Sequence, residues 1–443
     1  MQGTSSPESV STRLRQIAEL SRKRPEIALT TLAHHIDPSF LREAFERTRK
    51  DGATGIDKVT AEEYERELDS NLASLNDRFK SGNYKAPPVR RVYIPKGEGE
   101  KTRPIGIPTF EDKVLQRGVT MVLEAVYEQE FMECSYGFRR GRSAHDAVEA
   151  IWKGLMRQGS CWVLEVDIQG FFDTLDHQHL RSFLDRRIRD GVLRRAIDKW
   201  LKAGVMEEGS HKRSETGTPQ GGVISPMLAN IYLHEVLDKW FGKEVMPRLI
   251  GKATLVRYAD DFVIVFASER DAKKVMGVLP KRFGKYGLTL HPEKTRLIEF
   301  RPGRNGEGGR GSFDFLGFTH FWKLNRRKKW VVTRKTGKKP FRRVLHQIKG
   351  WCRRHRHWRV AEQYQMLVKK LQGHYAYYEI TGNSRALCVL REEVIKVWRK
   401  WLLRRSQRKR LNWERFHDFL NHYSLPRARV VCSIYHQVTN PLF

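Results

Sequence analysis

An acidic tetrapeptide between two apolar segments constrains the fold of this chain more than any other stretch. Tyr258-Ala259-Asp260-Asp261 lies between the β-rich runs 253–256 and 262–266, and this pattern predicts a hairpin with both aspartates at its tip. Carboxylates without partners are costly to bury, so such a pair usually faces a cation, and hard oxygen ligands suit Mg²⁺. Asp is also common in turns, so the tetrapeptide alone is equally compatible with a solvated turn.

A second acidic strand end favours the metal interpretation. Residues 162–168 form a strand-like run that carries Asp167 and leads into 169–173. If Asp167 and Asp260 converge, they can hold a pair of divalent cations, which in polynucleotide polymerases activate an attacking oxygen and stabilise a leaving one. By itself, Asp167 has the simpler interpretation of a strand-end capping residue, so the prediction depends on the combination.

Size and charge indicate a multidomain protein with a polyanionic partner. At 443 residues the chain is long enough for roughly three domains. Its net charge of +32 indicates nucleic acid as the partner. Residues 301–443 hold 34 Lys and Arg against 8 Asp and Glu, whereas residues 1–300 hold 49 against 43. This asymmetry predicts a catalytic body followed by a basic C-terminal clamp.

Cysteine usage and the chain start favour a reducing compartment. The five cysteines, at 134, 161, 352, 388 and 432, form no CxxC pair, so we expect neither a zinc site nor a disulfide framework. The first residues do not resemble a secretory signal, and no apolar run approaches the ~18 residues of a membrane span. We therefore expect a cytoplasmic protein without a membrane partner.

Hydrophobic periodicity and turn signals predict a mixed helix and strand (α+β) fold. Thr109 and Ser143 are expected to cap helices, and Ser225-Pro226 is expected to supply the N-cap and first residue of another. The expected helices cover 12–24, 38–50, 60–80, 109–130, 143–157, 225–240, 341–356, 361–378, 384–405 and 412–422. The expected strands cover 90–95, 103–108, 162–168 and the hairpin around 258–261, with a strand pair within 313–333.

Several ordered blocks within residues 40–330 resemble the fingers and palm of a reverse transcriptase, and the most similar family is the group II intron-encoded reverse transcriptase/maturase. The blocks are Gly55-Ile56-Asp57, Tyr93–Pro108, Ser135–Arg139, Val166–Asp173, Gly217–Gly222 with Ser225-Pro226, Tyr258–Asp261, Gly287–Thr295 and Phe315–Phe318. The resemblance implies a right-hand polymerase with fingers, a palm with an antiparallel sheet, and a helical thumb. We expect an N-terminal extension (1–85), fingers and palm (86–310), primer-grip strands with a basic helical thumb (311–405), and a short nucleic-acid-contacting segment (406–443).

The resemblance also implies a two-metal catalytic centre. Asp167, Asp260 and Asp261 correspond to the family's metal-binding triad, and the backbone carbonyl of Ile168 to a further ligand. Ile168 is equally compatible with a plain core position. The expected cofactor is a pair of Mg²⁺ ions, with Mn²⁺ as a possible substitute, and the expected reaction is nucleotidyl transfer from a dNTP to a DNA primer on an RNA template.

Nucleotide-binding residues follow from the same resemblance. Lys101 and Arg103 are expected to grip the triphosphate, although both would also suit an exposed hairpin flank. Phe172 corresponds to the aromatic residue that excludes a 2′-hydroxyl, and packing within the palm is its alternative. Gln220 is expected to contact the nucleotide beside two permissive glycines, and Lys294 to lie near the triphosphate, although a lone loop lysine is usually solvated.

The C-terminal third resembles the thumb, or maturase region, which in this family holds intron RNA and promotes its splicing. Leu316, Gly317 and Phe318 resemble the primer grip, with an ordinary strand as the alternative. Basic residues are expected to meet RNA phosphates, whereas most of the interleaved tryptophans are expected to form the helical core. The expected RNA-binding residues are Arg326, Arg327, Lys328, Arg342, Arg343, Arg353, Arg354, Arg404 and Arg405.

The resemblance has one departure and leaves alternatives open. Residues 406–443 contain neither paired cysteines nor an HNH cluster, so we expect no endonuclease domain there and hypothesise a primer from a nascent DNA strand at a replication fork. Efficient bottom-strand nicking by the ribonucleoprotein would contradict this hypothesis. Besides an intron-mobility enzyme with intron RNA and target DNA as partners, the sequence allows a freestanding reverse transcriptase for repair, defence or CRISPR spacer acquisition, or a splicing cofactor without catalysis. It predicts no oligomeric state.

Overall fold

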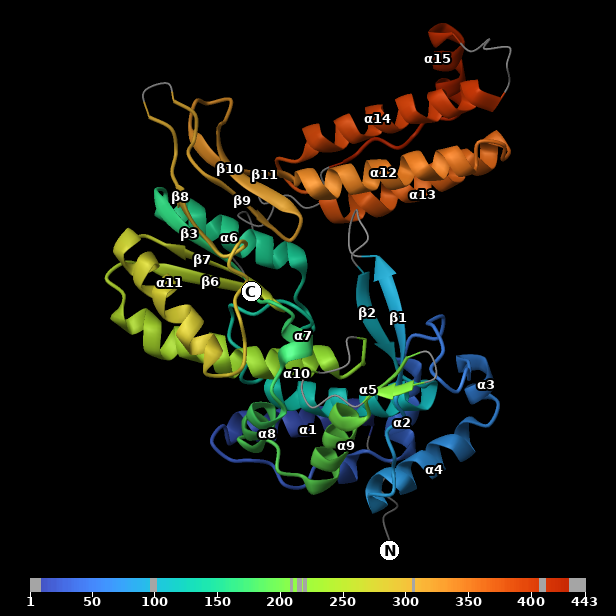
Figure 1. Cartoon of the computed structure of the whole chain (residues 1–443), viewed down its shortest axis with the longest axis vertical. Coiled ribbons are helices and arrows are strands. Elements are labelled where there is room, and N and C mark those ends of the chain that lie inside the picture. Colours follow the sequence, from blue (N-terminus) through green and yellow to red (C-terminus); the bar gives the residue numbers. More distant parts are fainter. Residues whose placement is uncertain are drawn as a thin grey trace, which may run out of the picture. The chain divides into compact units, whose positions relative to one another are not determined.

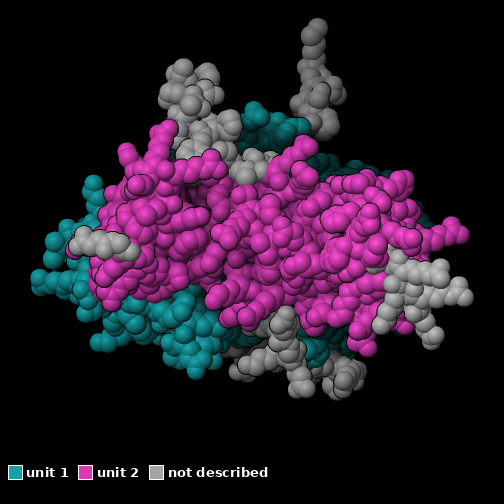
Figure 2. All heavy atoms as spheres, turned by 90° about the horizontal axis from the view of Figure 1, so that it is seen from above, with its two compact units in different colours: residues 1–147, 164–297 teal, residues 148–163, 298–443 magenta. Residues whose placement is uncertain are grey.

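The chain divides into two compact units. The computed structural model describes residues 9–95, 102–207, 210–212, 217, 221–304, 307–405 and 412–429. Unit 1 comprises residues 1–147 and 164–297, and unit 2 comprises residues 148–163 and 298–443 (Figure 2). Within the described ranges, no helix combines the length and the apolar character that a membrane crossing requires.

Unit 1 begins with helices that are held by polar caps. The Asp37 side chain accepts from the amide of Phe40, and Thr60 with Glu63 forms a complete capping box. Thr109 caps α5 through the amide of Asp112. The helices are α1 (Val10–Lys23), α2 (Pro38–Glu46), α3 (Ala61–Glu65), α4 (Leu68–Ser81) and α5 (Phe110–Tyr127), and Figure 1 shows α1 and α2 beside α5.

A small sheet follows α4 in unit 1. Its strands are β1 (Val89–Pro95), β2 (Thr102–Ile107), β4 (Val205–Glu207) and β5 (Ser210–Lys212). The strand order is β2-β1-β4-β5, with β1 antiparallel to β2 and parallel to β4. The β1–β2 hairpin therefore carries Arg103 opposite Ile94.

A second sheet, of order β6-β7-β3-β8, supports the acidic hairpin. Its strands are β6 (Ala253–Tyr258), β7 (Asp261–Phe266), β3 (Cys161–Asp167) and β8 (Arg296–Phe300), and the boundary between the units falls within β3 and β8. The helices of this part of unit 1 are α7 (Phe171–Thr174), α8 (His177–Asp185), α9 (Gly191–Lys202), α10 (Ser225–Leu233) and α11 (Glu269–Gly284). Helix α10 continues into π-helical turns at His234–Asp238 and Phe241–Val245.

Unit 2 combines a three-stranded antiparallel sheet with long helices. The strands are β9 (Ser312–Phe315), β10 (Phe318–Leu324) and β11 (Trp330–Thr336), in the order β11-β10-β9. The helices are α12 (Lys338–Arg354), α13 (Val360–Tyr378), α14 (Ser384–Leu402) and α15 (Trp413–His422), and α6 (Ala144–Gln158) contributes its residues from Val148 onward. Trp152 of α6 donates its indole N–H to the carbonyl of Val332 at 2.9 Å, which ties α6 to β11.

The sequence predictions are largely confirmed for the fold, with four corrections. The expected helix 60–80 is divided between α3 and α4, and the expected strand pair within 313–333 is a three-stranded sheet. Ser225 is the first helical residue rather than the N-cap, because Ile224 occupies the capping position. Helices α8, α9 and α11 were not predicted. The expected division into four segments remains a prediction.

Candidate active site and nucleic-acid surface

The acidic tetrapeptide forms the tip of the predicted hairpin. Strands β6 and β7 pair in antiparallel register, and Tyr258 lies directly opposite Asp261, so Ala259 and Asp260 form a two-residue turn. Ala259 has φ of +56°, a left-handed conformation that is unfavourable for a residue with a Cβ. Residues 262–266 are buried, so the strand that leaves the turn anchors it in the core.

Asp167 lies at the corresponding end of the neighbouring strand. It is the last residue of β3, which is adjacent to β7 in the sheet, and Asp261 is the first residue of β7. Burial, and then the negative charges of Asp260, Asp167 and Glu165, raise the pKa of Asp261 to about 7, whereas Lys294 opposes this rise. Asp260 lies in the turn next to Asp261, and Asp167 ends the strand beside the one that Asp261 begins, so the three predicted aspartates belong to adjacent segments of one sheet.

The segment 289–294 borders Asp167 and carries Lys294. The amide of His291 donates to the carbonyl of Asp167, and the amide of Gln169 donates to that of Thr289, each at 2.8 Å. Because these bonds flank Ile168, the carbonyl of Ile168 points to the opposite edge of its strand. Lys294 forms an ion pair with the Asp167 carboxylate while its side chain stays exposed, so its expected place near the triphosphate remains a prediction.

The donor set fits a divalent cation in its chemistry. Asp167, Asp260 and Asp261 offer hard oxygen ligands, which suit a divalent cation. Burial, with the neighbouring carboxylates as smaller causes, raises the pKa of Asp261 despite the opposing charge of Lys294. Among the described residues, however, no three Asp, Glu, His or Cys side chains already form an arrangement that could hold a metal ion. The ion pair with Lys294 occupies one oxygen of the Asp167 carboxylate.

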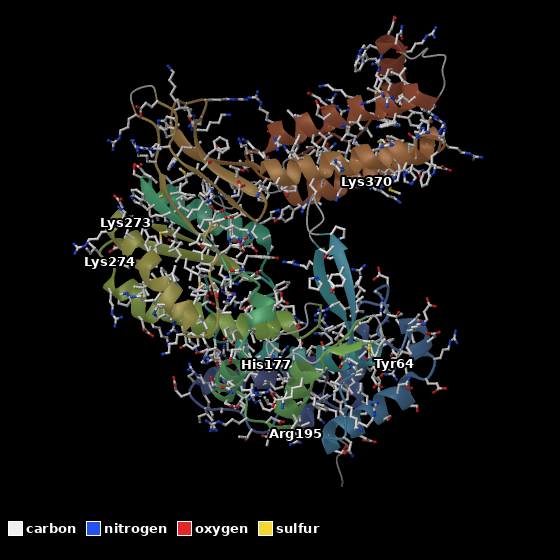
Figure 3. The ribbon with its side chains drawn as sticks, viewed as in Figure 1. Tyr64, His177, Arg195, Lys273, Lys274 and Lys370 are labelled. Atoms are coloured by element: carbon white, nitrogen blue, oxygen red, sulfur yellow. The ribbon has the colours of Figure 1, made fainter. Side chains whose placement is uncertain are left out.

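Phe172 and the glycine-rich loop are in contact. Phe172 is half-buried and meets Phe171 edge-on, whereas Phe171 is only 2 % exposed, as expected for a core residue. Gly217 has φ of +85°, and a Cβ there would lie 2.7 Å from the carbonyl oxygen of Phe172. The ring Nε2 of His177, labelled at the start of α8 in Figure 3, lies 2.6 Å from the Gly217 carbonyl oxygen. The first glycine of the loop is therefore held against the segment that carries Phe172.

The far end of this loop contacts the small sheet. A Cβ on Gly221 would lie 2.6 Å from the carbonyl oxygen of Gly106, so only glycine allows β2 this close. Arg103 of the same strand is exposed, which leaves its guanidinium accessible. Lys101 and Gln220 lie outside the described residues, so their expected nucleotide contacts remain predictions.

The expected primer-grip residues form the turn between β9 and β10 in unit 2. Leu316 and Gly317 have φ of +49° and +80°, and the Tyr377 hydroxyl donates to the Leu316 carbonyl at 2.9 Å. Phe318 is fully buried and stacks on Tyr377 with ring centroids 5.6 Å apart. Phe318 therefore anchors the turn, whereas Leu316 and Gly317 are half-buried, and the primer-grip role of all three remains a prediction.

The predicted RNA-binding side chains lie on the surface of unit 2. All are exposed except Arg405, which is half-buried and donates to the carbonyl of Trp358 at 3.1 Å. Arg326, Arg327 and Lys328 occupy the turn between β10 and β11. The core interpretation of the tryptophans is confirmed for Trp351 and Trp398, whereas Trp358 is 42 % exposed.

Sequence reasoning assigned no role to three residues that contact the acidic site or the glycine-rich loop. Glu165 adds to the negative charge on Asp261 and pairs with Arg296 at 2.6 Å. His177 contacts Gly217, and Arg257 is fully buried beneath the turn. Arg257 had a visible signal, since it is the only charged residue in the strand that precedes the tetrapeptide.

With this geometry established, comparison with known proteins defines the class. Residues 94–320 match the model of the reverse transcriptase (RNA-dependent DNA polymerase) family, and the chain belongs to that family. It is 34% identical over 328 residues to Protein YkfC of Escherichia coli, covering 65% of this chain and 84% of that protein.

More specific relatives come from group II introns. The chain is 43% identical over 186 residues to the group II intron-encoded protein LtrA of Lactococcus lactis, covering 42% of this chain and 30% of LtrA. It is 26% identical over 219 residues to the mitochondrial nuclear intron maturase 2 of Arabidopsis thaliana, covering 39% of this chain and 29% of that protein. The predicted resemblance to group II intron reverse transcriptases and maturases is therefore confirmed, although the chain spans only about a third of the length of these two relatives.

Proposed function

We propose that this protein is an RNA-directed DNA polymerase that binds its group II intron RNA, assists its splicing and copies it into cDNA for retrohoming into target DNA. The observation that carries the proposal is the position of the three aspartates: Asp167 ends β3, Asp261 begins the adjacent strand β7, and Asp260 lies in the turn directly before it. Concentrated carboxylates are what a nucleotidyl transferase needs to hold divalent cations beside a triphosphate.

The catalytic roles follow from the positions of the side chains. Asp167, Asp260 and Asp261 would hold two Mg²⁺ ions, with the carbonyl of Ile168 as a further ligand. When bound, Mg²⁺ would favour in-line attack by the primer 3′-hydroxyl on the α-phosphate and neutralise charge on the departing pyrophosphate. Lys294, released from Asp167, would be available to the triphosphate, and exposed Arg103 would bind its oxygens through charge-assisted hydrogen bonds.

Selection of DNA precursors is assigned to Phe172. Its ring is half-buried against Phe171, and the backbone behind it is held by contact with Gly217. A ring fixed in this way has little freedom to move aside, so it would clash with the 2′-hydroxyl of a ribonucleotide. Fingers, palm and thumb are assigned respectively to the β1–β2 region, to the sheet with Asp167 and Asp260, and to α12–α14.

The basic surface of unit 2 is proposed to hold intron RNA. Exposed Arg342, Arg343, Arg353 and Arg354 all lie on α12, whose buried residues Ile348, Trp351 and Cys352 face the core of the unit. The resulting helix has one apolar face and an arginine-rich remainder, which suits contact with phosphates.

The Asp260→Asn variant tests the enzymatic proposal. On a poly(rA)/oligo(dT) substrate with Mg²⁺, the wild-type protein should extend the primer, and the variant should lose this activity because one ligand charge is missing. Affinity for intron RNA and splicing assistance should persist, since the RNA surface lies elsewhere in the chain. DNA synthesis at the wild-type rate by Asp260→Asn would exclude the assigned centre, and no synthesis by the wild-type protein would favour a non-enzymatic splicing cofactor.

The biological setting has its own test. If the gene is flanked by intron RNA domains V and VI, the wild-type protein should bind that RNA and accelerate its splicing. A gene without such flanking sequence, coupled with active primer extension, would favour a freestanding reverse transcriptase.

A further inference from the structure

Arg257 is a charged residue in a strand that is otherwise built for the core. Leu255 and Val256 precede it in β6, and the whole Arg257 side chain has no solvent exposure. Its partner Asp238, in the π-helical turn after α10, is also fully buried. Removing two ions from water costs several kcal/mol each, and such pairs are often no more stabilising than apolar residues. Stability alone therefore gives little reason for this pair.

Every donor of the Arg257 guanidinium is used. Nε and Nη2 bind the two carboxylate oxygens of Asp238 at 2.8 and 2.6 Å. Nη2 also donates to the hydroxyl of Ser135 at 2.7 Å, and Nη1 donates to the side-chain oxygen of Asn230 at 3.0 Å. The fifth bond runs from Nη1 to the backbone carbonyl of Ala259, also at 3.0 Å. Lysine, with three donors on one nitrogen, has no geometry that reproduces this set.

The bond to Ala259 reaches the strained point of the catalytic turn. Ala259 holds φ of +56°, and such a conformation persists only where its surroundings impose it. The backbone of Gly137 packs directly on Ala259, since a Cβ on Gly137 would collide with the Ala259 amide nitrogen. The Asn230 side-chain amide in turn donates to the Gly137 carbonyl at 2.8 Å. Ala259 is thus held by Arg257 and by Gly137, and Asn230 connects these two contacts.

The backbone of β6 is fixed to the same segment. The amide of Arg257 donates to the carbonyl of Cys134, and the amide of Tyr136 donates to the carbonyl of Arg257, each at 2.8 Å. Burial by itself would lower the pKa of Arg257. The charges of Asp238 and, to a smaller extent, Asp260 outweigh burial, so the pKa of Arg257 is raised. The guanidinium is therefore near the carboxylate that follows Ala259 in the chain.

We infer that Arg257, with Asp238, Asn230 and Ser135, is a positioning assembly that holds Ala259 in its left-handed conformation and thereby aims Asp260 at the metal site. The inference rests on the proposed function, because it assigns a role only if Asp260 is a ligand. The assembly touches neither substrate nor metal and acts through the backbone of the turn.

The Arg257→Lys variant tests the inference without removing the buried positive charge. Two measurements are made on the full chain without nucleic acid: Mn²⁺ affinity, from the electron paramagnetic resonance signal of free Mn²⁺, and amide hydrogen exchange of the peptide containing residues 258–262. We expect Mn²⁺ affinity to fall about tenfold and exchange in this peptide to accelerate, because the turn loses its side-chain clamp.

On primer–template, kcat should fall on the order of a hundredfold with little change in the KM for dNTP, since misplacing a reacting group by about 1 Å costs that much.

Arg187→Lys is the matched control. Arg187 is also buried and multiply bonded, through the backbone carbonyls of Arg24 and Ile27 and an ion pair with Glu130, but none of its partners belongs to the catalytic turn. It should lower the melting temperature yet keep wild-type Mn²⁺ affinity and turn exchange. Gly137→Ala is the second variant: it leaves every charge in place, displaces Ala259 and should weaken Mn²⁺ binding as Arg257→Lys does.

The outcomes separate this inference from the proposed function. If Asp260→Asn still synthesises DNA and binds Mn²⁺ normally, the proposed function fails. If Asp260→Asn is inactive while folded Arg257→Lys keeps wild-type Mn²⁺ affinity and turn exchange, the positioning role is overturned. Should Arg257→Lys not fold, Gly137→Ala decides alone: unchanged Mn²⁺ affinity would overturn the inference, and weakened affinity would support it.

Discussion

Unit 1 keeps charged side chains in its interior, whereas unit 2 carries most of its charge on the outside. The ion pair between Arg257 and Asp238 is fully buried in unit 1, and so is Asp112, which accepts from the Trp200 indole at 2.7 Å and from Gln116 at 3.0 Å. These interior bonds fix backbone segments next to the acidic site: Arg257 holds Ala259, and the side-chain oxygen of Gln116 accepts from the amide of Ile224, which follows the glycine-rich loop.

Unit 2 also buries one arginine, Arg334 of β11, but the contacts that fix its sheet include uncharged ones. His320 is buried and stacks on Phe313 with an interplanar angle of 6°, and Asn383 accepts from the amide of Thr336 at 2.7 Å. The arginines of α12 point outward, and Lys370, labelled in Figure 3, lies over the ring of Trp351 at 5.7 Å. The comparison shows one unit in which charge sets geometry and another in which charge is presented for binding.

The largest effect expected from this contrast is on RNA affinity. Replacing Arg342, Arg343, Arg353 and Arg354 together by Ala should weaken binding of intron RNA on the order of a hundredfold at moderate salt. The slope of log affinity against log salt should become shallower by roughly 3, because four phosphate contacts are lost. Filter binding over a salt series measures both quantities.

The matched control removes the same charge from unit 1. Lys273, Lys274, Lys281 and Lys285 are exposed on or just after α11, and Figure 3 labels the first two. Their replacement by Ala should change affinity and slope far less. Equal losses from the two sets would mean that net charge, rather than the surface of unit 2, determines RNA binding.

A smaller effect is expected at Phe172. Phe172→Val shortens the half-buried ring, so ribonucleotide incorporation relative to dNTP incorporation should rise about tenfold, while RNA affinity stays constant. Single-nucleotide extension with rNTP and dNTP measures the ratio. Phe171→Leu is the neighbouring control and should lower stability without altering sugar selection. Unchanged discrimination in Phe172→Val would remove the gate assignment.

The sequence supported the acidic hairpin and the main helices because their signals are local. Alternating and continuous apolar runs predicted β6 and β7, and Thr109 and Ser143 were identified as caps from their neighbours along the chain. The convergence of Asp167 with the hairpin was a hypothesis from two acidic strand ends, which the family resemblance then supported, since no local rule states which strands become neighbours.

Long-range polar contacts could not be predicted in the same way. Arg257 meets Ser135 across 122 positions, and Asp112 meets Trp200 across 88. Propensity and periodicity describe one element at a time, so they give no information on which buried donors and acceptors pair. Lys294 is an example. The resemblance identified its segment, but its ion pair with Asp167 could be seen only once the structure showed that residues 289–291 pair with the end of β3.

The smallest expected effect is on stability and has opposite signs in the two units. Burial, despite hydrogen bonds from Tyr84, Trp200 and Gln116, raises the pKa of Asp112 to about 6. The folded state of unit 1 therefore binds a proton more tightly than the unfolded state does. Through Asp112, the stability of unit 1 should increase by about 2 kcal/mol as the pH falls from 7 to 4.5, and the raised pKa of Asp261 acts in the same direction. Burial, and then the charge of Arg334, lower the pKa of His320 to about 3, so unit 2 should lose roughly 2–3 kcal/mol over the same interval, in which only unfolded His320 takes up a proton.

Hydrogen exchange read peptide by peptide at pH 7 and pH 4.5, corrected for intrinsic rates, resolves these opposite changes. Peptides of β9–β11 should lose protection on acidification, and those of α5 should retain it. His320→Phe keeps a ring against Phe313 but has no site for a proton, so it should abolish the part of the loss in unit 2 that is due to His320. The part due to His374, whose pKa burial lowers to about 4, should persist. Replacing His346 by Phe should leave the loss unchanged, because this side chain is exposed on α12 and lies outside the core of unit 2. Equal acid sensitivity of His320→Phe and the wild-type protein would show that neutral His320 does not limit the stability of unit 2 in acid. The contrast between the units would then rest on their surfaces alone.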